Sequence, residues 1–132
     1  MLQTKTKTDI THALHATDVH HTKELYTTEE VRRAMASTAD RTPTIILFGA
    51  KACKQCRYFK PQLQSLVTKQ RIRLRVVNLA KATAGAFEEY KVKWAPTVAI
   101  VGIDGSPRFV PAATIEDVEL ELAKAGVPHW GV

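Results

Sequence analysis

The feature that most constrains the fold of this 132-residue chain is the apolar run Thr44-Ile45-Ile46-Leu47-Phe48-Gly49. Because the run is continuously apolar rather than alternating, it predicts a strand whose sheet is covered by helices on both faces. Cys53-Lys54-Gln55-Cys56 follows after three residues, and a helical pattern of apolar side chains begins there. The sequence therefore places two thiols where a buried strand leads into a helix.

The chain around this unit alternates between strand and helix patterns. Thr27 and Glu30 have the spacing of a capping box, which predicts a helix start. Pro61 lies inside the helix that follows the cysteines and is expected to kink it, and Asp104-Gly105-Ser106 predicts a hairpin turn. The expected strands are residues 24–26, 44–49, 72–77, 97–103 and 108–110, and the expected helices begin near residues 27, 53, 83 and 114. This order predicts a domain of the α/β class.

Length and composition favour one globular domain, which we expect to span residues 23–127. Residues 1–22 are rich in Thr and His and are expected to be a flexible N-terminal extension, and residues 128–132 a C-terminal tail. No apolar run approaches the ~18–20 residues of a membrane-spanning helix. The first nine residues lack the apolar stretch of a secretory signal. We therefore expect a cytoplasmic protein with no membrane association.

The positive charge of the chain is concentrated in its middle. Residues 51–93 contain eleven Lys and Arg residues against two Glu, whereas residues 1–50 are balanced. Such an excess could steer acidic partners or contact nucleic acid, or it could be a solvated face. No aromatic-basic interleaving or known motif supports specific nucleic-acid binding, which we do not expect.

The two cysteines occupy unequal positions. Cys53 lies at the predicted helix start, where free backbone N–H groups and the helix dipole favour a thiolate, and Lys54 and Lys51 add positive charge. Cys56 is one turn further on, on the apolar face. This asymmetry suits disulfide exchange, with Cys53 as nucleophile and Cys56 as the cysteine that resolves the mixed disulfide.

Two other interpretations of the cysteines stay open. Both thiolates could contribute to a metal site, whose remaining ligands would come from the tail histidines or from a second chain, because no second cysteine pair exists. Alternatively, both could be inert buried residues, although the helix-start position argues against this for Cys53. We favour the redox pair, which needs no metal and no cofactor.

Two further motifs make the chain resemble the thioredoxin family. Pro61 falls five residues after Cys56, where that family has a proline in its active-site helix, and the segment Tyr90 to Thr97 is similar to the family's Tyr-x-Val/Ile-x-x-x-Pro-Thr motif. The resemblance covers about residues 23–127. It implies a three-layer fold with a central mixed sheet and residues 44–49 in its middle. It also implies a cis Ala95–Pro96 peptide, beside which a substrate pairs as an added strand.

The chain also departs from the family pattern. The family's buried aspartate falls at Leu47, and its two active-site tryptophans fall at Gly49 and Ala52. Trp94 stands where a small residue is usual, and we hypothesise that it covers the disulfide. Because Lys54 favours the thiolate and an interior negative charge is missing, we expect a potential less negative than the ~−270 mV of thioredoxin. Without the aspartate, resolution by Cys56 is expected to be slow.

The resemblance implies a protein-disulfide oxidoreductase that acts on disulfide-containing proteins. Its catalytic residues would be Cys53 and Cys56, its substrate-binding segment Trp94-Ala95-Pro96, and its electron donor a thioredoxin reductase. We expect it to act as a monomer. The alternative is a protein-interaction module that uses the same scaffold with little turnover.

Overall fold

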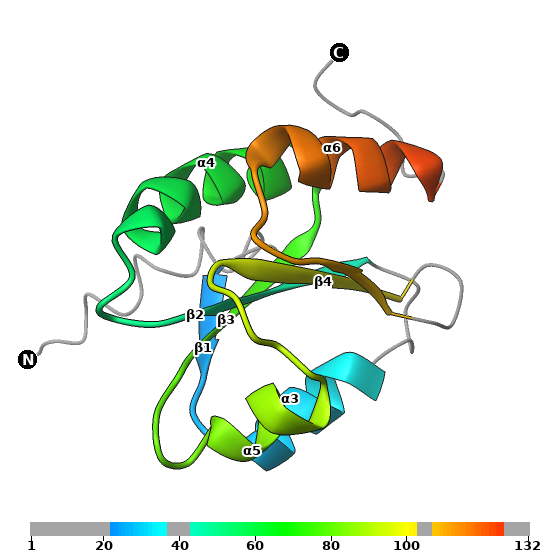
Figure 1. The fold of residues 1–132 in the computed structure, drawn as a ribbon. Helices are drawn as coiled ribbons and strands as arrows, with labels where there is room; N and C mark the ends of the chain where they lie inside the picture. Colours follow the sequence, from blue (N-terminus) through cyan, green and yellow to red (C-terminus); the bar gives the residue numbers. More distant parts are fainter. Residues whose placement is uncertain (1–21, 37–42, 103–106, 126–132) are drawn as a thin grey trace, which may run out of the picture.

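The computed structural model describes residues 22–36, 43–102 and 107–125 of the chain. Nearly all of the expected N-terminal extension, the expected turn at residues 104–106 and the C-terminal tail lie outside these residues. In chain order the elements are β1 (Thr22–Leu25), α3 (Thr28–Ala36), β2 (Thr44–Gly49), α4 (Lys54–Gln70), β3 (Arg73–Asn78), α5 (Ala84–Glu89), β4 (Thr97–Val101), β5 (Arg108–Val110) and α6 (Ile115–Lys124). Figure 1 shows how they are arranged.

The strands form one mixed sheet in the order β1-β3-β2-β4-β5. β2 lies in the middle, parallel to β3 and antiparallel to β4. β1 extends the parallel side and β5 the antiparallel side. The expected strand at residues 24–26 instead spans Thr22–Leu25, and β4 ends at Val101 rather than at residue 103.

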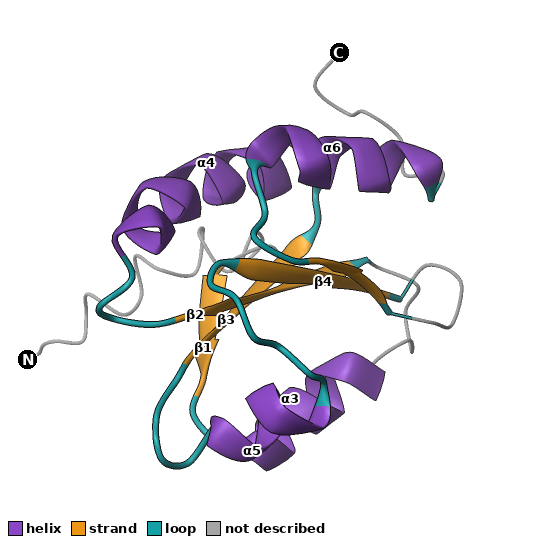
Figure 2. Cartoon of the chain, viewed as in Figure 1, coloured by secondary structure: helices purple, strands orange, loops and turns teal. Residues whose placement is uncertain are grey.

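Helices cover both faces of this sheet, as the apolar character of β2 predicts. α4 and α6 lie on one face and α3 and α5 on the other (Figure 2). All six residues of β2 are buried. Its side chains alternate between two apolar cores, with Ile45 and Leu47 facing α4 and α6, and Ile46 and Phe48 facing α3 and α5. The expectation of a central mixed sheet with helices on both faces is confirmed.

α4 carries the cysteine motif at its start and runs without a break through Pro61. Its buried stripe includes Cys56, Phe59 and Leu63, as the helical pattern predicts. The helix ends at Arg71, whose left-handed backbone (φ 56°, ψ 47°) closes the last turn. Within the described residues, no helix is long and apolar enough to cross a membrane.

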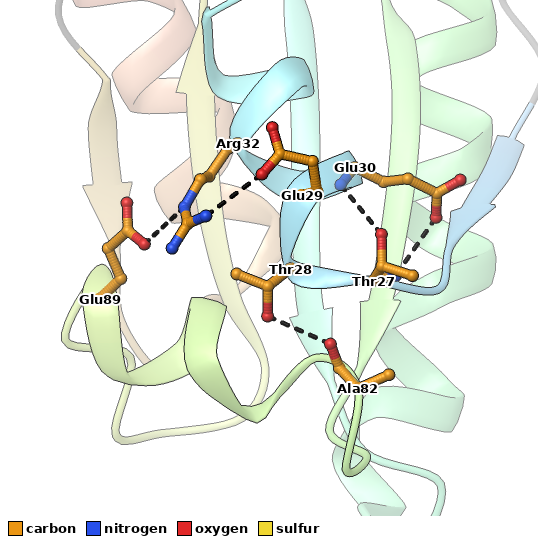
Figure 3. A network of polar contacts seen from close by, with 7 residues as sticks. All are labelled: Thr27, Thr28, Glu29, Glu30, Arg32, Ala82 and Glu89. Atoms are coloured by element: carbon orange, nitrogen blue, oxygen red, sulfur yellow. Dashed lines mark hydrogen bonds and ion pairs between the residues drawn. The ribbon is translucent and has the colours of Figure 1, made fainter.

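The start of α3 has the expected capping box. The Glu30 backbone N–H donates to Thr27 Oγ1 at 3.1 Å, and the Thr27 N–H donates to Glu30 Oε1 at 3.2 Å. Arg32 then bridges Glu29 at 3.2 Å and Glu89 at the end of α5 at 2.8 Å (Figure 3). These contacts hold α3 against α5 on the face opposite α4.

Candidate active site

The two cysteines form a disulfide at the start of α4. Cys53 is the N-cap residue, with extended backbone (φ −81°, ψ 111°), and its N–H donates to the carbonyl of Ala50 at 3.0 Å. Cys53 is half-buried, whereas Cys56 is only 8% exposed. The structure thus has the asymmetry expected from the sequence, with one sulfur nearer to solvent and the other on the inner face of the helix.

The surroundings of Cys53 favour negative charge on its sulfur. The Cys56 backbone N–H donates to Cys53 Sγ at 3.1 Å, which is the position of a side-chain helix cap. The first turn of α4 contains no acidic residue. The side chains of Lys51 and Lys54, which were expected to tune this thiol, are exposed on either side of it in sequence. A backbone N–H donor and a first turn free of acidic residues are general features that favour a thiolate at a helix start.

The inner sulfur lies against a small cavity of about 240 Å³. Nine residues line it: Leu47, Gly49, Ala50, Lys51, Cys56, Arg57, Lys60, Val76 and Asn78. Leu47 and Val76, which are neighbours on β2 and β3, supply apolar surface, and no carboxylate is among the lining residues. Leu47, where the family pattern has an aspartate, is therefore part of the wall beside Cys56.

Gly49 allows the close approach of strand and sulfur. A Cβ atom at this position would lie 3.3 Å from Cys56 Sγ and 3.6 Å from Asn78 Oδ1. The first distance is shorter than most real Cβ contacts, so a side chain here would press on the sulfur. A larger residue at this position, such as the family's tryptophan, would therefore require Cys56 Sγ to shift by a few tenths of an ångström.

Asn78 is a polar neighbour of Cys56 that the sequence reasoning missed. Its Nδ2 donates to Glu24 Oε2 on β1 at 3.0 Å, which directs Oδ1 toward the Gly49 side of the site. Asn78 could have been found from the pairing of β2 with β3. Gly49 and Asn78 are paired residues at the ends of parallel strands, and such ends meet at one edge of a sheet.

The segment Trp94-Ala95-Pro96 precedes β4 at this same edge. Phe48 pairs with Thr97, so the antiparallel register brings Pro96 beside the end of β2. The Ala95–Pro96 peptide is cis. Pro96 is buried, and its carbonyl accepts the Ala113 N–H at 2.8 Å, whereas Ala95 is exposed. Trp94 is 65% exposed, so most of the residue's surface faces solvent.

The described residues contain no group of three or more His, Cys, Asp or Glu side chains that could hold a metal ion. The tail histidines of the metal-site interpretation lie outside the described residues.

A family model described as Thioredoxin matches residues 18–119, which is more than half of the chain. No curated protein sequence matches. Among solved structures, thioredoxin O1 from Arabidopsis thaliana in the oxidized state is 19% identical, with a TM-score of 0.68 over 78% of this chain and 96% of that one. Thioredoxin f2 from Chlamydomonas reinhardtii is 17% identical, with a TM-score of 0.70 over 82% of this chain and 99% of that one. A chain from a complex of ferredoxin:thioredoxin reductase and thioredoxin f2 is 16% identical, with a TM-score of 0.71 over 81% of this chain and 96% of that one. At these identities the structural likeness concerns the fold, and that fold is the thioredoxin fold.

Proposed function

The chain belongs to the thioredoxin family and carries that family's C-x-x-C pair, consistent with a protein-disulfide oxidoreductase, and on this premise we propose that Cys53 is its nucleophile and Cys56 its resolving cysteine. The observation that carries this assignment is the N-cap position of Cys53. Its sulfur accepts the Cys56 N–H at 3.1 Å and is the less buried of the two. A nucleophile must reach the substrate, and a resolving thiol must be shielded until the mixed disulfide forms.

The reaction starts from the reduced protein. The Cys53 thiolate attacks one sulfur of the substrate disulfide, that bond breaks, and the leaving sulfur takes up a proton. Cys56 then loses its proton and attacks Cys53, which releases the second substrate thiolate to be protonated in turn. The substrate gains two electrons and two protons, and the protein is left with the Cys53–Cys56 disulfide.

Regeneration needs a reductant that supplies two electrons and two protons. We propose an enzyme of the thioredoxin reductase class as this donor. The support is the family membership together with the structural likeness to a thioredoxin f2 whose structure is of a complex with ferredoxin:thioredoxin reductase. We further propose that the domain of residues 23–127 acts as a monomer in a reducing, cytoplasm-like compartment.

The segment Trp94-Ala95-Pro96 is the proposed substrate-binding strand. Ala95 is exposed next to buried Pro96, so its backbone is available to an extended polypeptide at the edge where β2 and β4 end. The Trp94 carbonyl accepts the Thr97 hydroxyl at 2.6 Å, which restrains the turn. Trp94 itself is the proposed cover of the sulfur pair.

We propose that the protein, with its Cys-Lys-Gln-Cys active site, is an atypical member of the thioredoxin family. Leu47 and Val76 line the cavity beside Cys56, and no carboxylate is among its lining residues. We therefore propose slow deprotonation of Cys56 and a potential less negative than ~−270 mV.

Reduction of insulin disulfides tests the proposed function, first with dithiothreitol and then with a thioredoxin reductase and NADPH. We expect turnover that Cys53→Ser abolishes, and we expect Cys56→Ser to accumulate a mixed disulfide. The atypical motif and the absence of a carboxylate from the residues that line the cavity beside Cys56 also favour a second candidate, an interaction module with little turnover. A double Cys53→Ser, Cys56→Ser variant that retained biological activity would support the module and contradict the enzyme.

A further inference from the structure

A group of four basic side chains surrounds the start of α4. This basic rim consists of Lys51, Lys54, Arg57 and Lys60, of which the first three are exposed and the last is half-buried. No Asp or Glu occurs in the sequence between Asp40 and Glu88. Within the part of the chain that the structure describes, none of the four cations forms an ion pair with a carboxylate. The rim is therefore a local excess of positive charge.

Three residues of the basic rim line the same cavity as Cys56. Lys51, Arg57 and Lys60 are three of its nine lining residues, and they share it with Cys56 and with the apolar side chains of Leu47 and Val76. A substrate lying over this cavity would meet cations around an apolar wall, beside the inner sulfur of the disulfide. The charge of the rim is therefore adjacent to the redox pair.

Two other described helices, α3 and α6, have acidic residues in their first turns. α3 has Glu29 and Glu30 in its first turn, and α6 has Glu116 and Asp117. Such acids offset the positive end of the helix dipole. α4 has none, and it adds Lys54 and Arg57 instead. Within the described residues, the start of α4 is therefore left without a compensating negative charge of its own.

We propose that the basic rim selects protein disulfides that are flanked by Asp or Glu residues. This inference rests on the proposed function and narrows its substrate class. Charge complementarity at the rim of an interface mainly raises the association rate, and oriented clusters do so by roughly 10- to 1,000-fold at low salt. Tyr58 and Trp94 are both largely exposed and supply the aromatic contacts that protein interfaces favour. A polypeptide fits better than nucleic acid because the cations surround a disulfide and a cavity.

Two fluorogenic peptides test the proposal. They are identical except that the residues flanking one internal disulfide are Glu in the first and Gln in the second. The second-order rate constant for reduction by the pre-reduced protein is measured for each, and each is divided by the rate with dithiothreitol to remove intrinsic reactivity. At low salt we expect the Glu peptide to react about tenfold faster. At ~1 M salt, where the Debye length is ~3 Å, the ratio should approach one.

Variants at two positions of the basic rim identify the surface. Arg57→Gln with Lys60→Gln should lower the Glu/Gln ratio several-fold at low salt. Lys69→Gln, an exposed lysine in the last turn of the same helix, is the matched control and should leave the ratio unchanged. Arg57→Glu with Lys60→Glu should reverse the preference toward a Lys-flanked peptide, a gain that misfolding cannot imitate.

The possible outcomes distinguish a failure of the proposed substrate selection from a failure of the proposed oxidoreductase function. If neither peptide is reduced, the proposed oxidoreductase function fails. If both are reduced at equal normalised rates at low salt, the function stands and the basic rim has no role in selection. Equal rates together with tight binding of a single-stranded RNA oligonucleotide, lost in the double Gln variant, would overturn the proposal in favour of a nucleic-acid surface.

Discussion

Replacing Leu47 by Asp tests whether the apolar wall beside Cys56 limits turnover. Leu47 is 1% exposed, is paired with Val76 and Val98 in the centre of the sheet, and lines the cavity next to Cys56. A carboxylate at this position would face the thiol that must lose a proton before it can attack. In the unsubstituted chain, no carboxylate lines this cavity to accept that proton.

Two magnitudes determine the expected result. Removing a buried leucine side chain costs ~2–5 kcal/mol of the free energy of unfolding, out of the ~5–15 kcal/mol of a typical domain. The variant should therefore be less stable but folded. General-base catalysis contributes ~10²-fold or more, so we expect resolution of the mixed disulfide to be at least about tenfold faster at pH 7. Burial raises the pKa of the introduced carboxyl, so this gain should be lost as the pH falls and the carboxyl is protonated.

Release of thionitrobenzoate from Cys53, followed by stopped-flow absorbance over pH 5–9, measures the resolution rate directly. In the unsubstituted protein the rate should rise about tenfold per pH unit below the pKa of the Cys56 thiol, because the thiolate is the attacking species. Leu47→Asn is the matched control, with nearly the same shape and loss of burial but no base. Equal resolution rates for the Asp and Asn variants would refute the reasoning.

Three further results are expected. Lys54→Glu should raise the pKa of the Cys53 thiol, since a nearby cation is replaced by an anion; alkylation rates against pH measure this, and an unchanged profile would contradict the tuning role of Lys54. In a Trp130→Phe background, the fluorescence of Trp94 should change when the disulfide is reduced, and an unresponsive signal would exclude it as a cover. Thr114→Ala, which removes the capping box of α6, should cost about 1 kcal/mol of stability in thermal unfolding, with no effect on thiol reactivity.

The central layer and the cysteine site could be predicted because their determinants are local. An uninterrupted apolar strand must be covered on both faces, and the Thr27–Glu30 spacing satisfies free N–H groups whatever the tertiary structure. The N-cap position of Cys53 follows from the change between the apolar strand pattern of residues 44–49 and the helical pattern that begins at the cysteines. Such features need only a few neighbouring residues to specify them.

The polar surroundings of Cys56 could not be predicted in the same way. The contact of Asn78 with Glu24 joins residues 54 positions apart and depends on the pairing of β1 with β3, which no short pattern specifies. The cavity likewise depends on how closely Gly49 approaches the sulfur. Lys60 could have been found, since it lies four residues after Cys56 on a helix and therefore beside it.

The two apolar cores of the domain are complete without the cysteines, because Cys56 is buried but belongs to neither core. The disulfide also closes a ring of only four residues, so it restricts the unfolded chain very little. The bond can therefore open and close while the scaffold keeps its shape. Repeated oxidation and reduction of the two cysteines should therefore leave the apolar cores unchanged, and each catalytic cycle should return the protein to the same folded state.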